Sequence, residues 1–255
     1  MKSGNYFVLT VIMFVMITVL SCTKEADITV TRLTCNFSEQ PLGIDTSEPL
    51  LGWQIRSSGR NIVQSAYHIL VALSTDELKE NKGTIWDSGK TNSEQSINVL
   101  LKGIKLQPGQ RYFWKVKIWD TEGRESSWSE ASWWQTGLFS ENDWQGAQWI
   151  CYEVIDSSLV LVPGIHGSGD NLGDKALQRP VIPQFRKSFA VGKKLLRATL
   201  SVSGLGHYEA YINGQKVGGS FLTPGWTDYD KSVFYNTRDV TPLLKEGENV
   251  LGALV

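Results

Sequence analysis

Residues 111–120 read RYFWKVKIWD, and this stretch decides the fold class. Alternate residues share one face of an extended chain, and four large apolar side chains fall on the same face: Tyr112, Trp114, Val116 and Ile118. Pro108-Gly109 before the stretch and Glu122-Gly123 after it are turn signals. The stretch therefore predicts a β-strand with one buried face.

Similar short, alternating stretches surround this strand and are separated by turn residues. They are Leu51–Arg56, Tyr67–Ser74, Ile85–Ser88, Ser96–Leu101 and Ala131–Thr136. One short helix is predicted over Thr75–Asn81, where a plausible cap begins about two turns of helical pattern. Such spacing is typical of a β-sandwich, and we place a first domain at residues 28–138.

The end of this domain resembles a known module. Leu106–Gly137 contains a Pro-Gly turn, the aromatic strand and a Trp-Ser element at Trp128-Ser129, and it resembles the last strands of a fibronectin type III domain. That resemblance implies a domain that binds its neighbours or holds them apart. Asp120, Glu122 and Glu125 are expected to be turn and loop charges, because no nucleophile is paired with a base here.

Strand patterns resume after residue 183 and predict a second antiparallel sandwich over residues 183–255. The stretches are Phe185–Phe189, Leu196–Ser203, Tyr208–Ile212, Lys216–Gly218, Ser232–Asn236 and Asn249–Val255. Asn213-Gly214 lies between two of them, which is the strongest short hairpin signal. The fold class is therefore all-β, with two antiparallel β-sandwich domains.

The second domain carries a specific set of motifs. Tyr208-Glu209, Tyr211–Gly214, Pro224–Tyr229 and Gly247–Asn249 follow one another in fixed order between Gly206 and Val255. This stretch resembles the amino-terminal jelly-roll module of bacterial α-L-rhamnosidases. The linker Trp144–Ala147 and the preceding sandwich also resemble that family, so the resemblance covers nearly the whole chain after residue 27.

The resemblance implies hydrolysis of terminal α-L-rhamnosides with inversion, by carboxylates on an (α/α)6 barrel downstream of these modules. No barrel pattern occurs in the 255 residues, and Asn249–Val255 reads as a strand. We therefore expect a truncated module, a non-catalytic accessory part whose partner is a downstream catalytic domain. Two alternatives stay open: a stand-alone surface carbohydrate-binding lipoprotein, and a purely structural spacer.

A rhamnose-containing glycan is the expected ligand. A sugar site pairs a flat aromatic face with polar groups, and Trp226, Asp228 and Tyr229 supply both within four residues, with Glu209 near the preceding hairpin. The alternative is that Trp226 plugs one end of the sandwich and Tyr229 packs under the loop. Catalysis by Glu209, Asp228 and Asp230 would rest on sequence proximity alone, and no catalytic residue is predicted.

Residues 139–182 are expected to form a linker, with a strand at Trp144–Ile150 and a Gly-rich loop at Pro163–Gly173. Asp170-Asn171 offers oxygen donors for calcium, as in the calcium-assisted rhamnose binders that the module resembles, or for a self-bonded turn. Calcium is thus a possible ligand, and no cofactor is required.

The amino terminus predicts export. An apolar run, Tyr6–Leu20, ends at Ser21-Cys22 and is too short for an ordinary membrane span. Residues 1–22 resemble a lipoprotein signal peptide in which Cys22 is lipidated, and Lys24, Glu25 and Asp27 then resemble the signal of surface lipoproteins in Bacteroidetes-type bacteria. The alternative is a plain secretory signal peptide in which Cys22 is incidental. We expect an outer-membrane lipoprotein that contacts the membrane only through its lipid.

Cysteine use and charge narrow the partners further. Cys35 and Cys151 are expected mainly as unpaired, buried residues, with a bridge between them as the less favoured alternative. His68 sits in a strand pattern and is expected to be a strand residue. With 25 Lys and Arg against 26 Asp and Glu, the chain has a net charge of −1 and no basic footprint, so nucleic acid is excluded as a partner.

Overall fold

The computed structural model describes residues 27–152 and 182–255, which fall into two compact units. Of the described residues, unit 1 contains 27–40, 48–104 and 111–134, and unit 2 contains 41–47, 105–110, 135–152 and 182–255. Both units consist mainly of antiparallel strands, so the all-β fold class is confirmed. Within the described ranges, no helix combines the length and apolarity that crossing a bilayer would require.

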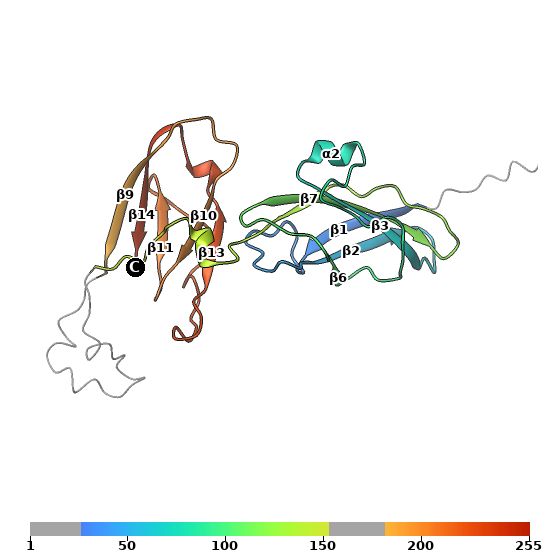
Figure 1. Cartoon of the computed structure of the whole chain (residues 1–255), viewed down its shortest axis with the longest axis horizontal. Coiled ribbons are helices and arrows are strands. Elements are labelled where there is room, and N and C mark those ends of the chain that lie inside the picture. Colours follow the sequence, from blue (N-terminus) through green and yellow to red (C-terminus); the bar gives the residue numbers. More distant parts are fainter. Residues whose placement is uncertain (1–26, 153–181) are drawn as a thin grey trace, which may run out of the picture. The chain divides into compact units, whose positions relative to one another are not determined.

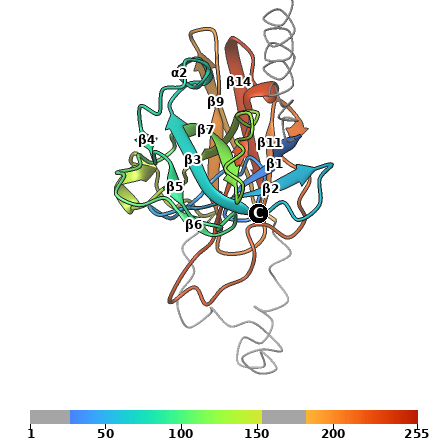
Figure 2. The ribbon, with the colours of Figure 1, turned by 90° about the vertical axis from the view of Figure 1, so that its right-hand side faces the viewer.

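Unit 1 is built from two sheets. One has the order β1-β2-β6, and the other has the order β4-β3-β7-β8 with β5 also paired to β3. Figure 2 shows β4 and β5 beside β3. The strands are β1 Ile28–Cys35, β2 Leu50–Ser57, β3 Gln64–Ala72, β4 Trp86–Asp87, β5 Thr91–Asn92, β6 Val99–Leu100, β7 Arg111–Asp120 and β8 Ser132–Gln135.

Strand β7 occupies the residues predicted for it, and its alternation decides the core. Tyr112, Trp114, Val116 and Ile118 are each at most 2% exposed. Trp134 of β8 stacks on Tyr112 at 5.3 Å, and Trp53 of β2 meets Tyr67 of β3 edge-on at 5.4 Å. Aromatic side chains from both sheets thus fill the interior, as expected for a sandwich.

The predicted helix is α2, Thr75–Lys79, and lies against the β3–β7 sheet (Figure 1). Ser74 accepts a hydrogen bond from the Glu77 backbone N–H, and the Glu77 carboxylate accepts one from the Ser74 backbone N–H. This capping box satisfies two donors that a helix start leaves unpaired. Leu78 is buried with Leu70 and Ala72, which fixes the helix on the sheet.

The Trp-Ser element is a structural device. Ser126 and Ser129 accept hydrogen bonds through Oγ from the backbone N–H groups of Ile118 (3.0 Å) and Val116 (3.1 Å) of β7. Their own backbone N–H groups donate to the carbonyls of the same two residues at 2.9 Å. Trp128 lies between them and packs against the buried cluster under α2. This segment therefore covers β7 where a regular strand would otherwise pair.

Unit 2 also contains two sheets, of order β12-β11-β14-β9 and β10-β13. Figure 1 shows β9, β14 and β11 next to one another. The strands are β9 Gln184–Val191, β10 Thr199–Ser203, β11 Glu209–Ile212, β12 Gln215–Lys216, β13 Tyr235–Asp239 and β14 Gly247–Leu254. Short 3-10 turns, η1 Glu141–Trp144 and η4 Thr241–Leu243, interrupt the connections.

Several details differ from the sequence-based expectations. Trp144–Ile150 contains no strand, because the chain forms η1 and then turns at Gln145, which has a positive φ of 53°. The strand expected at Ser232–Asn236 lies three residues later as β13, and the first strand, β1, was not predicted.

The two described cysteines are free and differ in environment. Cys35 is 1% exposed at the end of β1, and burial raises the pKa of its thiol to about 12. The expectation of a small, unpaired, buried residue is confirmed for Cys35. It is wrong for Cys151, which is exposed. His68 lies within β3, as expected, and its Nε2 is 2.6 Å from Oδ1 of Asp87.

Candidate functional site

The hairpin between β11 and β12 organises the candidate site in unit 2. Asn213 and Gly214 have φ values of 51° and 81°, as the type I′ turn that suits two-residue hairpins requires. The Asn213 side chain also accepts a hydrogen bond from the Val250 backbone N–H at 3.0 Å. Its amide nitrogen donates to the Leu243 carbonyl at 2.9 Å. The hairpin is therefore tied to β14.

Asn249 completes this connection. It is 0% exposed, and its Oδ1 accepts hydrogen bonds from the Asn213 amide nitrogen at 2.8 Å and the Lys245 backbone N–H at 3.0 Å. Its own amide nitrogen donates to the carbonyls of Lys245 and Gly247 at 2.7 and 2.9 Å. A buried polar side chain with all its groups paired is stabilising, so the Gly247-Glu248-Asn249 motif has a structural role.

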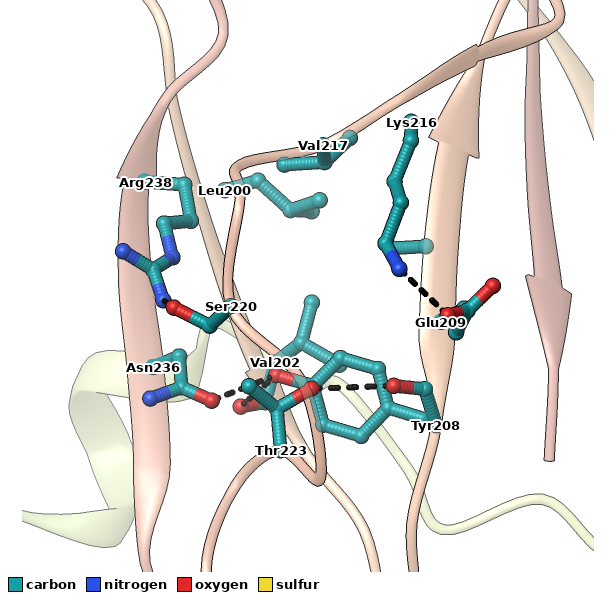
Figure 3. A pocket seen from close by; sticks show the side chains of 11 residues that line it. Leu200, Val202, Tyr208, Glu209, Lys216, Val217, Ser220, Thr223, Asn236 and Arg238 are labelled. Carbon is teal, nitrogen blue, oxygen red and sulfur yellow. Dashed lines mark hydrogen bonds and ion pairs between the residues drawn. The ribbon is translucent and has the colours of Figure 1, made fainter.

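A small pocket opens between the two sheets of unit 2, beside this hairpin (Figure 3). Its lining residues come from β10, β11, β12 and β13 and from the segment that follows β12. They are Leu200, Val202, Tyr208, Glu209, Ala210, Lys216, Val217, Ser220, Thr223, Asn236 and Arg238. The volume is about 20 Å³, which holds about one water-sized group.

Tyr208 forms one wall of the pocket and is only 9% exposed. Its hydroxyl lies 3.0 Å from Oδ1 of Asn236 and 3.2 Å from the Val202 carbonyl oxygen. Thr223 donates a hydrogen bond from Oγ1 to the Tyr208 carbonyl at 2.9 Å. Burial raises the pKa of the Tyr208 phenol, so this wall stays neutral and acts as a fixed hydrogen-bonding support.

Glu209 and Lys216 form an ion pair at one side of the pocket (Figure 3). The Tyr211 hydroxyl donates a further hydrogen bond to Glu209 at 2.5 Å. The Lys216 ammonium lowers the pKa of the Glu209 carboxyl, with a further contribution from Tyr211. Glu209 is therefore an anion whose charge is balanced by its neighbour.

Arg238 lies on the opposite side of the pocket, on β13, and donates a hydrogen bond to Ser220 Oγ at 2.6 Å. Gly218 permits this position, because its φ is +74° and a Cβ there would lie 3.2 Å from Arg238 Nε. The guanidinium thus packs closely against the backbone that follows β12.

Both sandwich domains match models of known families. Residues 30–140 match the Rha78A-like, N-terminal immunoglobulin domain, and residues 193–255 match the Alpha-L-rhamnosidase N-terminal domain. A protein of Formosa agariphila named Alpha-L-rhamnosidase is 35% identical over 224 residues, 88% of this chain and 24% of its own length. This chain belongs to the α-L-rhamnosidase family.

Other members of the family agree with this assignment. A protein of Streptomyces avermitilis named Alpha-L-rhamnosidase is 34% identical over 77% of this chain and 19% of its own length. The solved α-L-rhamnosidase from Dictyoglumus thermophilum has a TM-score of 0.76 and 35% identity, covering 89% of this chain and 25% of its own. The one from Aspergillus terreus has a TM-score of 0.67 and 26% identity, with 89% and 24% covered. The chain therefore spans about a fifth to a quarter of the length of these relatives.

The first domain is described in this family as immunoglobulin-like, whereas the sequence motifs resembled a fibronectin type III domain. Both are antiparallel sandwiches with related architecture, so the predicted fold stands and the immunoglobulin-like description is the one supported by the match.

The sequence-predicted site residues are only partly gathered at the pocket. Glu209 lines it, but Trp226, Asp228 and Tyr229 do not belong to the lining. Trp226 is 68% exposed and Tyr229 is 37% exposed. Asp228 pairs with Lys231 at 2.7 Å and accepts a backbone hydrogen bond from Asp230 at 3.3 Å. Asp170, Asn171 and Cys22 lie outside the described residues.

Sequence reasoning missed the polar residues that β13 contributes, Asn236 and Arg238. They are two positions apart on one strand, so both side chains face the same way. The strand predicted at Ser232–Asn236 ended before Arg238, and YNTRD at residues 235–239 has no hydrophobic period that would have extended it.

Proposed function

We propose that this chain is the accessory, non-catalytic amino-terminal part of an enzyme that hydrolyses terminal α-L-rhamnosides. The observation that carries the proposal is the extent of the match: nearly nine tenths of the chain align with about a quarter of each of the most similar relatives and solved structures. The proposal requires a partner, the catalytic (α/α)6 barrel of the same enzyme. This barrel would lie downstream of the quarter that the chain matches.

The chemistry of the described carboxylates supports a non-catalytic role. An inverting glycosidase needs one carboxyl group that keeps its proton near neutral pH as the general acid. The pKa of Glu209 is instead lowered by Lys216. Asp228 is held in its own turn and paired with Lys231. Glu209 therefore lacks the environment of a general acid.

The loop between β12 and β13 supports glycan recognition over a purely structural role. Trp226 leaves two thirds of its surface exposed, and an indole combines a flat apolar face with a polar N–H, which makes Trp frequent at binding surfaces. Asp228 and Tyr229 add polar groups that can pair with sugar hydroxyls. We therefore assign rhamnose-containing glycan as the ligand of this loop.

Calcium and a lipid anchor are further parts of the proposal. Asp170 and Asn171 would supply oxygen ligands to calcium, and Cys22 would carry the lipid at the outer membrane. Cys22→Ser is expected to move the protein from the membrane fraction to the soluble fraction of cells that process lipoproteins. Retention of the variant in the membrane fraction would exclude the lipid anchor.

Two measurements on the full chain test the proposed function. An aryl α-L-rhamnoside should release no more phenol with the chain than in buffer, and turnover would contradict the non-catalytic assignment. Calorimetric titration with L-rhamnose should show binding that weakens after Trp226→Ala and on calcium removal. Heat that is absent in every titration would leave only the structural role.

A further inference from the structure

The pocket between the sheets of unit 2 has an excess of hydrogen-bond donors on its β13 side. Arg238 carries five N–H donors, and the structure shows one of its nitrogens bonded to Ser220 Oγ at 2.6 Å. Asn236 accepts through Oδ1 from the Tyr208 hydroxyl at 3.0 Å. Within residues 27–152 and 182–255, its amide nitrogen donates to no side chain or carbonyl.

The charge of Arg238 is not balanced locally. Among the described residues, no carboxylate lies within ion-pair distance of its guanidinium. The carboxylate that does line the pocket, Glu209, is already paired with Lys216 and hydrogen-bonded to Tyr211. The pocket therefore keeps the positive charge of Arg238, with its one acid neutralised.

The geometry places these donors together. Arg238 and Asn236 project from one face of β13 toward the pocket, as Figure 3 shows. An arginine fork can bind both oxygens of a carboxylate, and the neighbouring amide nitrogen supplies a third donor. Leu200, Val202 and Val217 form an apolar wall. Because this wall offers no hydrogen bonds, a bound carboxylate would be recognised by Arg238 and Asn236.

The size of the pocket limits what enters it. A volume of about 20 Å³ accepts a group of about the size of one water molecule, which admits an oxygen of a carboxylate at the mouth but not a sugar ring. A ring attached to that carboxylate would lie at the mouth. Phe221 follows the pocket-lining Ser220 in the chain, with 82% of its surface exposed, and the Nζ of Lys216, which also lines the pocket, lies 4.9 Å from its ring centre.

We propose that this pocket binds the carboxylate of an acidic sugar, a uronic acid residue, through Arg238 and Asn236, with the sugar ring against Phe221. The inference rests on the proposed glycan-recognition role and names an acidic component of the glycan. It concerns a position separate from Trp226, Asp228 and Tyr229.

Matched probes test this proposal on the full chain. NMR titrations with methyl β-D-glucuronide and its neutral twin, methyl β-D-glucoside, should give a dissociation constant at least about tenfold lower for the glucuronide, as expected for a charge-assisted bidentate pair. Acetate should bind more weakly than the glucuronide, because it lacks the ring. If the two glycosides bind with equal affinity, the carboxylate assignment is wrong. If acetate binds as tightly as the glucuronide, the sugar assignment is wrong.

Variants then locate the site. Arg238→Gln should remove the preference for the glucuronide, whereas Arg186→Gln, the same change at an exposed arginine on β9, should leave it intact. Arg238→Lys should recover part of the preference, because the charge remains and the fork is lost. An equal loss of glucuronide preference in Arg238→Gln and Arg186→Gln would refute the site. Thermal unfolding of each variant checks that it is folded.

This test fails separately from the proposed function. If the glucuronide shows no preference while L-rhamnose still binds in a Trp226-dependent way, the pocket assignment is wrong and the accessory role stands. If neither sugar binds, both glycan assignments fail.

Discussion

The Asn249 network offers the sharpest test of how the second sandwich is held together. Asn249→Ala removes four hydrogen bonds from a side chain that is 0% exposed. Leaving a buried donor or acceptor unpaired costs about 1–3 kcal/mol per group. Lys245 and Gly247 are exposed and can bond to water, so we count one or two groups and expect a loss of about 2–4 kcal/mol.

Differential scanning calorimetry of the full chain measures this loss in the transition of unit 2. For a unit of this size, about 3 kcal/mol corresponds to a fall in Tm of roughly 10 °C. Asn142→Ala, at an exposed position in η1, is the matched control and should change Tm by less than about 2 °C. A change of the same small size for Asn249→Ala would refute the reasoning.

Two predictions concern the first sandwich. Asp120 is 1% exposed, and although burial alone would raise its pKa, hydrogen bonds from the Arg124 side chain and backbone lower it. Asp120→Asn should cost about 2 kcal/mol near neutral pH in urea unfolding. The difference in the free energy of unfolding between the wild type and Asp120→Asn should become smaller as the pH falls below about 4 and passes through the folded pKa of Asp120. A difference that does not change with pH would contradict this. Ser129→Ala should cost about 1–2 kcal/mol because it leaves the Val116 N–H unpaired, whereas exposed Ser127→Ala should be neutral.

The strands with strict alternation could be predicted from sequence, and the reason is visible in the packing. Arg111–Asp120 coincides with β7 because Tyr112, Trp114, Val116 and Ile118 alternate along it and face one interior. The Asn213-Gly214 turn was equally predictable, because the positive φ values of this turn type favour Asn followed by Gly. Strand alternation and turn preferences depend only on residues that are close in sequence. They can therefore be applied without knowledge of the tertiary fold.

The pocket could not be predicted in the same way. Its polar side depends on Arg238 and Asn236 reaching across from a strand whose mixed residues, YNTRD, carry no hydrophobic period. The motif containing Trp226 was conspicuous in sequence, yet it lies outside the pocket lining. Strand pairing determines which side chains from separate strands come together. No single stretch of sequence reveals which strands pair.

The central claim, an accessory domain pair that recognises glycan without cleaving it, is tested most directly by saturation-transfer NMR with a rhamnose-capped oligosaccharide and the full chain. The account predicts transfer to the rhamnosyl protons and no free rhamnose in the same sample after prolonged incubation. Free rhamnose in molar excess over the protein, or no transfer to any sugar proton, would contradict it.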